Sequence, residues 1–366
     1  MITADPRETV ALFQRYPELH GRLPWTVLGS YPTPVRPLEI AAARVPVLQK
    51  REDLSGEAYG GNKVRTIEGH VGRALALGRE RIWATGAWGS NHAVATAVHA
   101  RRAGLRVGAA LIPQPPSLPA HANLRALAAC DVTVTDAASW LWRPAAAVAL
   151  LRDPREVVMT PGGAVPIGSL GHVSAALELA TQVQAGELPA PAHVVVTVGS
   201  TATSAGLLVG FALAAGLGIG LSTPPTLHAV RVAPWPVTSR AAIVWLARRT
   251  LVHLQRLLGR PLPVEPRTLG AHLRVDGARN GRGYGYPTDS GAMAQRVFSV
   301  GHSPPLDTVY TARSGAGLLA LLPQAQGPVV HWMTKSSRPL PEPTPAQLEA
   351  LPPRLQRWLA RPPLDA

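Results

Sequence analysis

Lysine is almost missing from this chain. Among 366 residues and 36 basic side chains, only Lys50, Lys63 and Lys335 are lysines, the other basic residues being arginine. Arginine cannot form a Schiff base, whereas a desolvated lysine amine can lose its proton and attack a carbonyl. Lys63 follows two glycines in Gly60-Gly61-Asn62-Lys63, so we predict that the site uses its primary amine. The alternative is an ordinary surface lysine in a turn.

Cysteine and acidic residues are also scarce. The single cysteine, Cys130, excludes a disulfide framework and is predicted to be a small buried residue of a protein from a reducing compartment. The net charge of +14 could attract nucleic acid, but the arginines are scattered from Arg7 to Arg361 and form no stripe with interleaved aromatic residues. We therefore expect no nucleic-acid partner. The densest basic stretch, residues 240–260, is predicted to be an amphipathic helix with a solvated face or a subunit contact.

The tract from Leu188 to Val230 contains no charged side chain, which taken alone would suggest a membrane span. Hydroxyl residues between positions 197 and 204 interrupt it, and each apolar half is shorter than the ~20 residues that a spanning helix needs. A buried strand followed by a buried helix explains the same pattern. The N-terminus lacks the basic region and apolar core of a secretory signal, so we predict a cytoplasmic protein with no membrane contact.

Apolar strand candidates alternate with helical stretches along the chain. This alternation predicts an α/β protein with parallel sheets, and the length exceeds what one core usually serves, so two lobes are expected. The strand candidates are residues 81–86, 106–112, 131–135, 156–160, 194–198 and 226–232.

Two strand-to-helix junctions have the composition of anion sites. Ser90 and Asn91 stand between the first strand candidate and a helical pattern, where helix N–H groups lack partners. The loop from Gly199 to Gly206 follows the strand at 194–198 and precedes another helix. Such junctions bind carboxylates or phosphates. Taken in isolation, each is also explained by a capped turn without a ligand.

In this order, the lysine motif, Ser90-Asn91-His92 and the loop from Gly199 resemble the D-cysteine desulfhydrase and 1-aminocyclopropane-1-carboxylate deaminase family of pyridoxal-phosphate enzymes. Similar segments continue along most of the chain, among them Pro161-Gly162-Gly163-Ala164 and Asp307-Thr308-Val309-Tyr310-Thr311. The resemblance implies the tryptophan synthase β-like fold, fold type II, which is a two-lobed α/β fold with open, twisted parallel sheets. It places the small lobe at residues 76–170 and the large lobe at residues 1–75 plus 171–366, and it implies a homodimer.

The resemblance also implies the roles of individual residues. Lys63 would hold pyridoxal 5'-phosphate as a Schiff base and act as the base at Cα, and no metal is expected. Asn91 would contact the phenolic oxygen of the cofactor, and Thr334 would face its pyridine nitrogen. Ser90, Asn91 and His92 would border the substrate carboxylate. The remaining cofactor contacts would come from Asn62, Gly199, Ser200, Thr201, Ala202 and Thr203.

The implied reaction is β-elimination from a small amino acid, as in D-cysteine desulfhydrase, with release of a 2-oxo acid and ammonia. Tyr284 and Tyr310 could serve as catalytic acids or bases, or could only pack against the ring. Ring-opening deaminases of the family have a glutamate where this chain has Thr311, which argues against a cyclopropane substrate. A 1-aminocyclopropane-1-carboxylate deaminase, a diverged cofactor-binding relative and a basic α/β scaffold for an acidic partner remain alternatives.

The chain departs from the family pattern where glycines are expected. It has Ala312 and Arg313 in place of Gly-Lys, and Lys335 and Ser336 in place of Gly-Gly; Thr201 and Ala202 also replace glycines. Such changes remove backbone freedom and are expected to add bulk near the cofactor.

Overall fold

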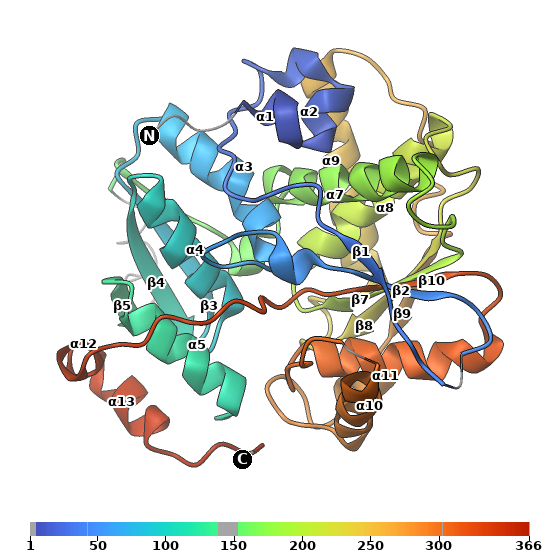
Figure 1. Ribbon diagram of the computed structural model, residues 1–366. Coiled ribbons are helices and arrows are strands. Elements are labelled where there is room, and N and C mark those ends of the chain that lie inside the picture. Colours follow the sequence, from blue (N-terminus) through green and yellow to red (C-terminus); the bar gives the residue numbers. More distant parts are fainter. Residues whose placement is uncertain (1–4, 42, 138–152, 302, 366) are drawn as a thin grey trace.

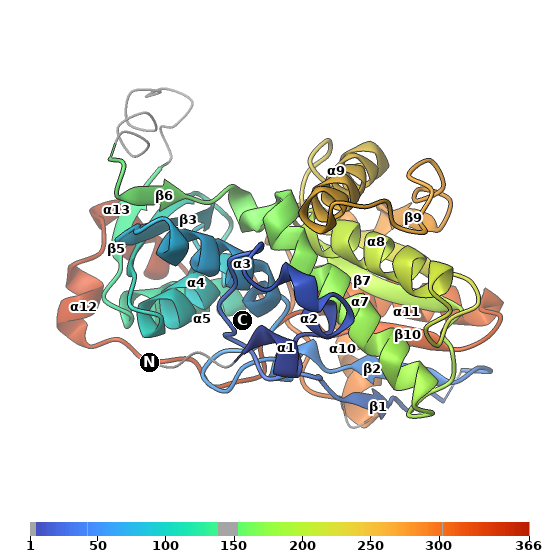
Figure 2. The same ribbon diagram turned by 90° about the horizontal axis from the view of Figure 1, so that it is seen from above.

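The computed structural model describes residues 5–41, 43–137, 153–301 and 303–365. Two sheets lie side by side, each with helices packed on it (Figures 1 and 2). The four-stranded sheet is parallel throughout, in the order β5-β4-β3-β6. In the six-stranded sheet, ordered β1-β2-β10-β7-β8-β9, only the β1–β2 pair is antiparallel. The strands are β1 (Val35–Pro37), β2 (Val47–Lys50), β3 (Arg81–Ala87), β4 (Arg106–Ile112), β5 (Thr133–Asp136), β6 (Glu156–Val158), β7 (His193–Val198), β8 (Thr226–Arg231), β9 (Leu273–Asp276) and β10 (Val329–Trp332).

The helices cover the sheets and complete the lobes. They are α1 (Pro6–Thr9), α2 (Ala11–Arg15), α3 (Lys63–Ala76), α4 (Asn91–Arg102), α5 (Leu118–Ala128), α7 (Pro166–Gln184), α8 (Ala202–Gly216), α9 (Arg240–Leu258), α10 (Asp289–Val300), α11 (Thr311–Leu321), α12 (Pro345–Glu349) and α13 (Pro353–Leu359). Short 3₁₀ turns occupy Pro17–Leu19, Glu52–Leu54, Pro161–Gly163, Ala278–Asn280 and Leu322–Gln324.

Alternation of side chains along β7 builds a core on each face of the large sheet. Val194, Val196 and Val198 pack with α7, α8 and α9, whereas Val195 faces the cluster formed by α10 and α11. A strand buried on both faces reads as a continuous apolar run, which is why β7 and α8 together produce the uncharged tract. No helix in the described ranges is long and apolar enough to cross a membrane.

The predicted α/β fold with parallel sheets is confirmed, and all six strand candidates are strands. The short strands β1, β2, β9 and β10 were not predicted. Cys130 is half-buried rather than part of the core. The lobe boundaries stay a prediction, but α7 runs continuously through residue 170, and Leu351, Leu355 and Trp358 of the C-terminal segment pack in the core of the small sheet.

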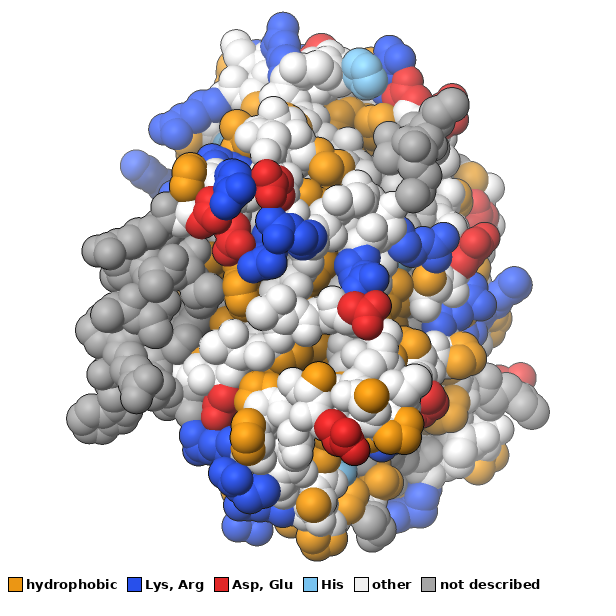
Figure 3. Space-filling model, turned by 90° about the vertical axis from the view of Figure 1, so that its left-hand side faces the viewer, with side chains coloured by type: hydrophobic (Ala, Val, Ile, Leu, Met, Phe, Trp, Pro, Cys, Tyr) orange, Lys and Arg blue, Asp and Glu red, His pale blue; other side chains and the backbone are white. Residues whose placement is uncertain are grey.

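Charged side chains are dispersed over the surface. On the face shown in Figure 3, basic groups lie in several separate clusters with acidic groups among them. Exposed ion pairs such as Arg106–Glu80 and Arg125–Glu342 are of this kind. Residues 240–258 of the basic stretch form α9, whose apolar face packs on α7 and α8.

Candidate active site

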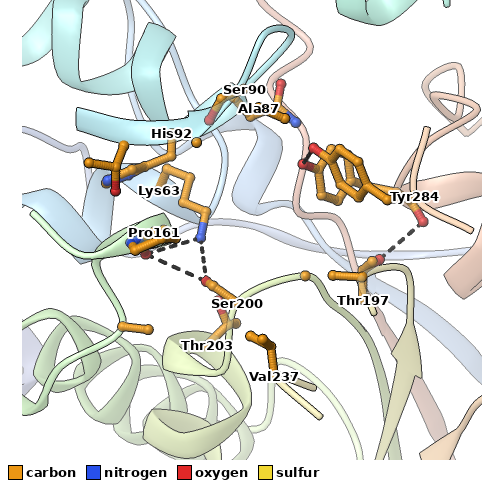
Figure 4. Close-up of a pocket in the computed structure, with 18 of the residues that line it drawn as sticks. Lys63, Ala87, Ser90, His92, Pro161, Thr197, Ser200, Thr203, Val237 and Tyr284 are labelled. Atoms are coloured by element: carbon orange, nitrogen blue, oxygen red, sulfur yellow. Dashed lines mark hydrogen bonds between the residues drawn. The ribbon is translucent and has the colours of Figure 1, made fainter. Parts of the chain in front are cut away.

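A cavity of about 430 Å³ lies where the carboxyl ends of strands from both sheets meet. Crevices at this edge of parallel sheets are the usual ligand sites of α/β proteins. The predicted site residues that line it are Asn62, Lys63, Ser90, Asn91, His92, Gly199, Ser200, Thr203, Tyr284, Tyr310 and Thr334. Figure 4 labels Lys63, Ser90, His92, Ser200, Thr203 and Tyr284 among them.

Lys63 is the first residue of α3 and the only one of the three lysines on the cavity wall. Its Nζ atom donates to Ser200 Oγ at 2.9 Å and lies 3.4 Å from the carbonyl oxygen of Gly162. Desolvation lowers the pKa of this amine to about 8. Roughly one amine in ten is therefore neutral at pH 7, enough for a nucleophile or base.

Gly162 belongs to a segment that resembles the family, and the structure shows what this glycine does. Its φ of +66° is in the left-handed region, and a Cβ atom there would lie 2.5 Å from Ser200 Oγ and 3.2 Å from Lys63 Nζ. Only glycine brings a carbonyl to the lysine amine without displacing the serine.

Ser90 and His92 lie at the start of α4, on the small-lobe side of the cavity. The Ser90 hydroxyl caps the helix by accepting from Ala93 N at 3.3 Å. His92 is buried, and neither ring nitrogen has a hydrogen-bond partner among the described residues. Burial, together with the charge of Lys63, holds the pKa of His92 well below its usual value. The imidazole is therefore neutral, with a free N–H near the helix N-terminus.

The turn from β7 into α8 forms the large-lobe side of the cavity. Gly199, Ser200 and Thr203 line the wall, and Thr203 Oγ1 accepts from Asn62 Nδ2 at 2.8 Å. Thr201, the N-cap residue of α8, and Ala202, its first residue, do not line the wall. If Thr201 and Ala202 contact the cofactor, they must do so through the backbone N–H groups at the start of α8.

Tyr284 and Tyr310 form a pair whose hydroxyls are 2.5 Å apart. Desolvation raises the pKa of Tyr284 and raises that of Tyr310 well above its usual value. Both phenols are therefore protonated at neutral pH and can donate hydrogen bonds or a proton. Arg313 fixes the loop that carries Tyr284, because its guanidinium donates to the carbonyl oxygens of Gly283 and Tyr286 at 2.7 and 2.5 Å.

Thr334 lies on the cavity wall with a buried hydroxyl that has no partner among the described residues. An unpaired buried polar group costs free energy, so this hydroxyl suits a hydrogen bond with a ligand bound in the cavity. Thr311, in contrast, is not on the wall: its Oγ1 donates to Asp307 Oδ1 at 2.8 Å.

The expected bulk of the replaced glycines is absent from the cavity wall. Ala312, in α11, packs in the core that α11 forms with α10, and Ser336 Oγ accepts from Gly60 N at 2.9 Å. Lys335 points toward Tyr59 and Asn123. Neither Tyr59 nor Asn123 was predicted, because they become neighbours of Asn91 only in the folded chain.

The family model described as "Pyridoxal-phosphate dependent enzyme" matches residues 27–334. A crystal structure described as an "ACC deaminase homologue" superimposes with a TM-score of 0.69 at 25% sequence identity, over 88% of this chain and 96% of that chain.

Three curated relatives differ in the reaction that their names state. Nocardicin C-9' epimerase of Nocardia uniformis subsp. tsuyamanensis is 34% identical over 87% of this chain and 94% of its own length. D-cysteine desulfhydrase of Salmonella schwarzengrund is 31% identical over 74% and 79%. A putative 1-aminocyclopropane-1-carboxylate deaminase of Pyrococcus abyssi is 36% identical over 56% and 61%.

Proposed function

Because this chain belongs to the family of pyridoxal-phosphate-dependent enzymes, we propose that it removes the Cα proton of a small amino acid and eliminates a group at Cβ, as a D-cysteine desulfhydrase does. The observation that carries this proposal is the desolvated Lys63 amine, which shares one cavity with the protonated Tyr284–Tyr310 pair. A base and an acid in one enclosed site suit a reaction that takes a proton and releases a leaving group.

The cavity fits the cofactor at three places. The amine of Lys63 can bind the aldehyde carbon, and the unpartnered hydroxyl of Thr334 suits the pyridine nitrogen. The turn at Gly199–Thr203, which opens the 15-residue helix α8, suits the phosphate. When bound, the cofactor withdraws electrons from Cα and so makes its proton removable.

The residues of the chain supply binding, orientation and proton transfer. Ser90 and the neutral imidazole N–H of His92 hold the substrate carboxylate at the start of α4. Lys63 takes the Cα proton, and Tyr310 or Tyr284 donates to the departing group. With D-cysteine, water is consumed and pyruvate, ammonia and hydrogen sulfide are released. A homodimer and a cytoplasmic location remain predictions from the sequence.

Substrate preference provides the test. We expect pyruvate release from D-cysteine or β-chloro-D-alanine to be faster than 2-oxobutyrate release from 1-aminocyclopropane-1-carboxylate, because no Asp or Glu is among the described residues that line the cavity. A keto-acid assay with equal concentrations of each compound measures this. A preference for the cyclopropane would overturn the desulfhydrase assignment.

Epimerisation of a larger amino acid is a second candidate. Part of the cavity lining is apolar: Ala87 and Ile112 are register partners at the ends of β3 and β4, and Ala233, Pro234 and Val237 come from the large lobe. The epimerase relative also covers nearly the full chain. Exchange of the Cα hydrogen for deuterium in D₂O, with an apolar amino acid and without keto-acid release, would favour this candidate over elimination.

The phosphate assignment predicts the effect of a charge at Gly199. A Cβ atom there would lie 3.2 Å from the Tyr310 ring, so a larger side chain adds some crowding. Gly199→Asp should weaken pyridoxal-phosphate binding by roughly tenfold or more through charge repulsion, and Gly199→Asn, of the same size, should weaken it less. Equilibrium dialysis measures both dissociation constants. Wild-type affinity in Gly199→Asp would mean that the phosphate lies elsewhere.

A further inference from the structure

The Asn91 carboxamide is held by a chain of hydrogen bonds that ends at the Lys335 ammonium. Its Oδ1 accepts from Asn123 Nδ2 at 2.7 Å and from the Tyr59 hydroxyl at 3.2 Å. Asn123 Oδ1 in turn accepts from Lys335 Nζ at 3.1 Å, and the same ammonium lies 3.4 Å from the Tyr59 hydroxyl. The contacts join α4, α5 and the segment after β10.

These partners fix the orientation of both carboxamides. Lys335 can only donate, so Asn123 must present its oxygen to the ammonium, and its Nδ2 also donates to the Gly89 carbonyl at 2.9 Å. Asn91 then faces two donors with its oxygen. Its NH₂ group is left for the cavity, and no group in the described part of the chain accepts from it.

Backbone contacts hold the segment that carries Lys335 in place. The segment that carries it pairs with the residues before Lys63: Gly61 and Lys335 form an antiparallel bridge, and Asn62 N donates to Thr334 O at 3.1 Å. Its ammonium lies 5.4 Å from the centre of the Tyr59 ring. Within the described ranges, no carboxylate forms an ion pair with Lys335, so the charge is not neutralised locally.

We propose that Lys335, Asn123 and Tyr59 are positioning residues that hold the Asn91 NH₂ group toward the phenolic oxygen of pyridoxal phosphate. The charge of Lys335 polarises the chain of amides, and hydrogen bonds in such a chain strengthen one another. An N–H polarised in this way donates more strongly to an oxyanion. The inference rests on the family assignment and not on which amino acid is the substrate.

The test measures the bound cofactor and needs no turnover. In Lys335→Met, we expect the pH midpoint of the visible absorbance change of bound pyridoxal phosphate to rise by roughly 0.5–1 unit, because a nearby positive charge favours the form that has lost a proton. The dissociation constant should increase about three- to tenfold. Lys335→Arg keeps the charge and should restore most of both values.

Asn123→Asp tests the orientation itself. Two oxygens cannot face each other across a hydrogen bond, so the Asn91 carboxamide would turn its NH₂ group away from the cavity. Binding of pyridoxal phosphate should then be weaker than in Lys335→Met. This variant also keeps the inference testable if Lys335→Met does not fold.

Arg338→Met is the matched control, because Arg338 lies three residues further along the same segment and donates to the Gly56 carbonyl, outside the Asn91 network. Arg338→Met should leave the pH midpoint of the absorbance change and the dissociation constant for pyridoxal phosphate unchanged. An equal midpoint shift in this control, or wild-type values in both Lys335→Met and Asn123→Asp, would overturn the inference. Absence of pyridoxal-phosphate binding by the wild-type protein would overturn the proposed function as well.

Discussion

Lys63→Ala is expected to abolish covalent attachment of pyridoxal phosphate and to lower the reaction rate by about 10²–10⁴-fold or more, while the fold is retained. The amine is the only lysine nitrogen on the cavity wall, and its described hydrogen-bond partners, Ser200 and Gly162, also lie on that wall and not in the core. Borohydride reduction of the wild-type protein with the cofactor, followed by peptide mapping, identifies the attached residue. Thermal unfolding checks the fold.

Lys63→Arg is the matched control, because it keeps the positive charge but cannot form a Schiff base. It should be as inactive as the alanine variant. Label on Lys50 or Lys335 would contradict the assignment. Both have other partners: Lys50 Nζ donates to Glu178 and Gln182, and Lys335 belongs to the Asn91 network.

The pH dependence of attachment follows from the lowered pKa of Lys63. The neutral amine is the nucleophile, and desolvation brings its pKa to about 8. In the cofactor-free protein, the attachment rate should therefore rise with pH and level off above about pH 8. A stopped-flow measurement of the absorbance change would follow this rise.

Glu178→Gln is expected to destabilise the protein by about 3–5 kcal/mol, because it breaks a buried ion cluster and leaves positive charge uncompensated. Glu178 accepts from Lys50 Nζ at 2.5 Å and from Arg65 Nη2 at 2.8 Å, and all three side chains are buried. Arg65 also pairs with Glu52 at 2.7 Å. Arg65 is two residues from Lys63 on α3, so loss of the cluster should also disturb the lysine. Urea unfolding followed by tryptophan fluorescence measures the change.

Glu342→Gln is the control for this prediction, since the Arg125–Glu342 pair is largely exposed and should contribute at most about 1 kcal/mol.

Burial alone would raise the pKa of Glu178, but Arg65 and Lys50 outweigh burial and lower the pKa to about 2. The contribution of its ionised form is present above the usual pKa of 4.5 and is lost as the pH falls toward 2. The difference in the free energy of unfolding between wild type and Glu178→Gln should therefore become smaller as the pH is lowered. A variant within 1 kcal/mol of wild type at pH 7 would contradict the prediction.

The sequence by itself determined the elements whose signals are local. The buried strands and the helices after them were readable from apolar runs and from the residues at their junctions, and the scarcity of lysine singled out Lys63. The resemblance in the order of these segments indicated the cofactor and the fold, which the family model and the structural comparison confirm.

Tertiary structure decided what depends on contacts between distant parts of the chain. Short strands such as β10 have no pattern of their own and exist because their neighbours supply hydrogen-bond partners. Lys335 illustrates the same limit. In the sequence it stands where the family has a glycine, whereas in the fold its side chain points away from the cavity and contacts Asn123, 212 positions away. The direction of a side chain is set by the groups packed around it, and those groups become neighbours only when the chain has folded.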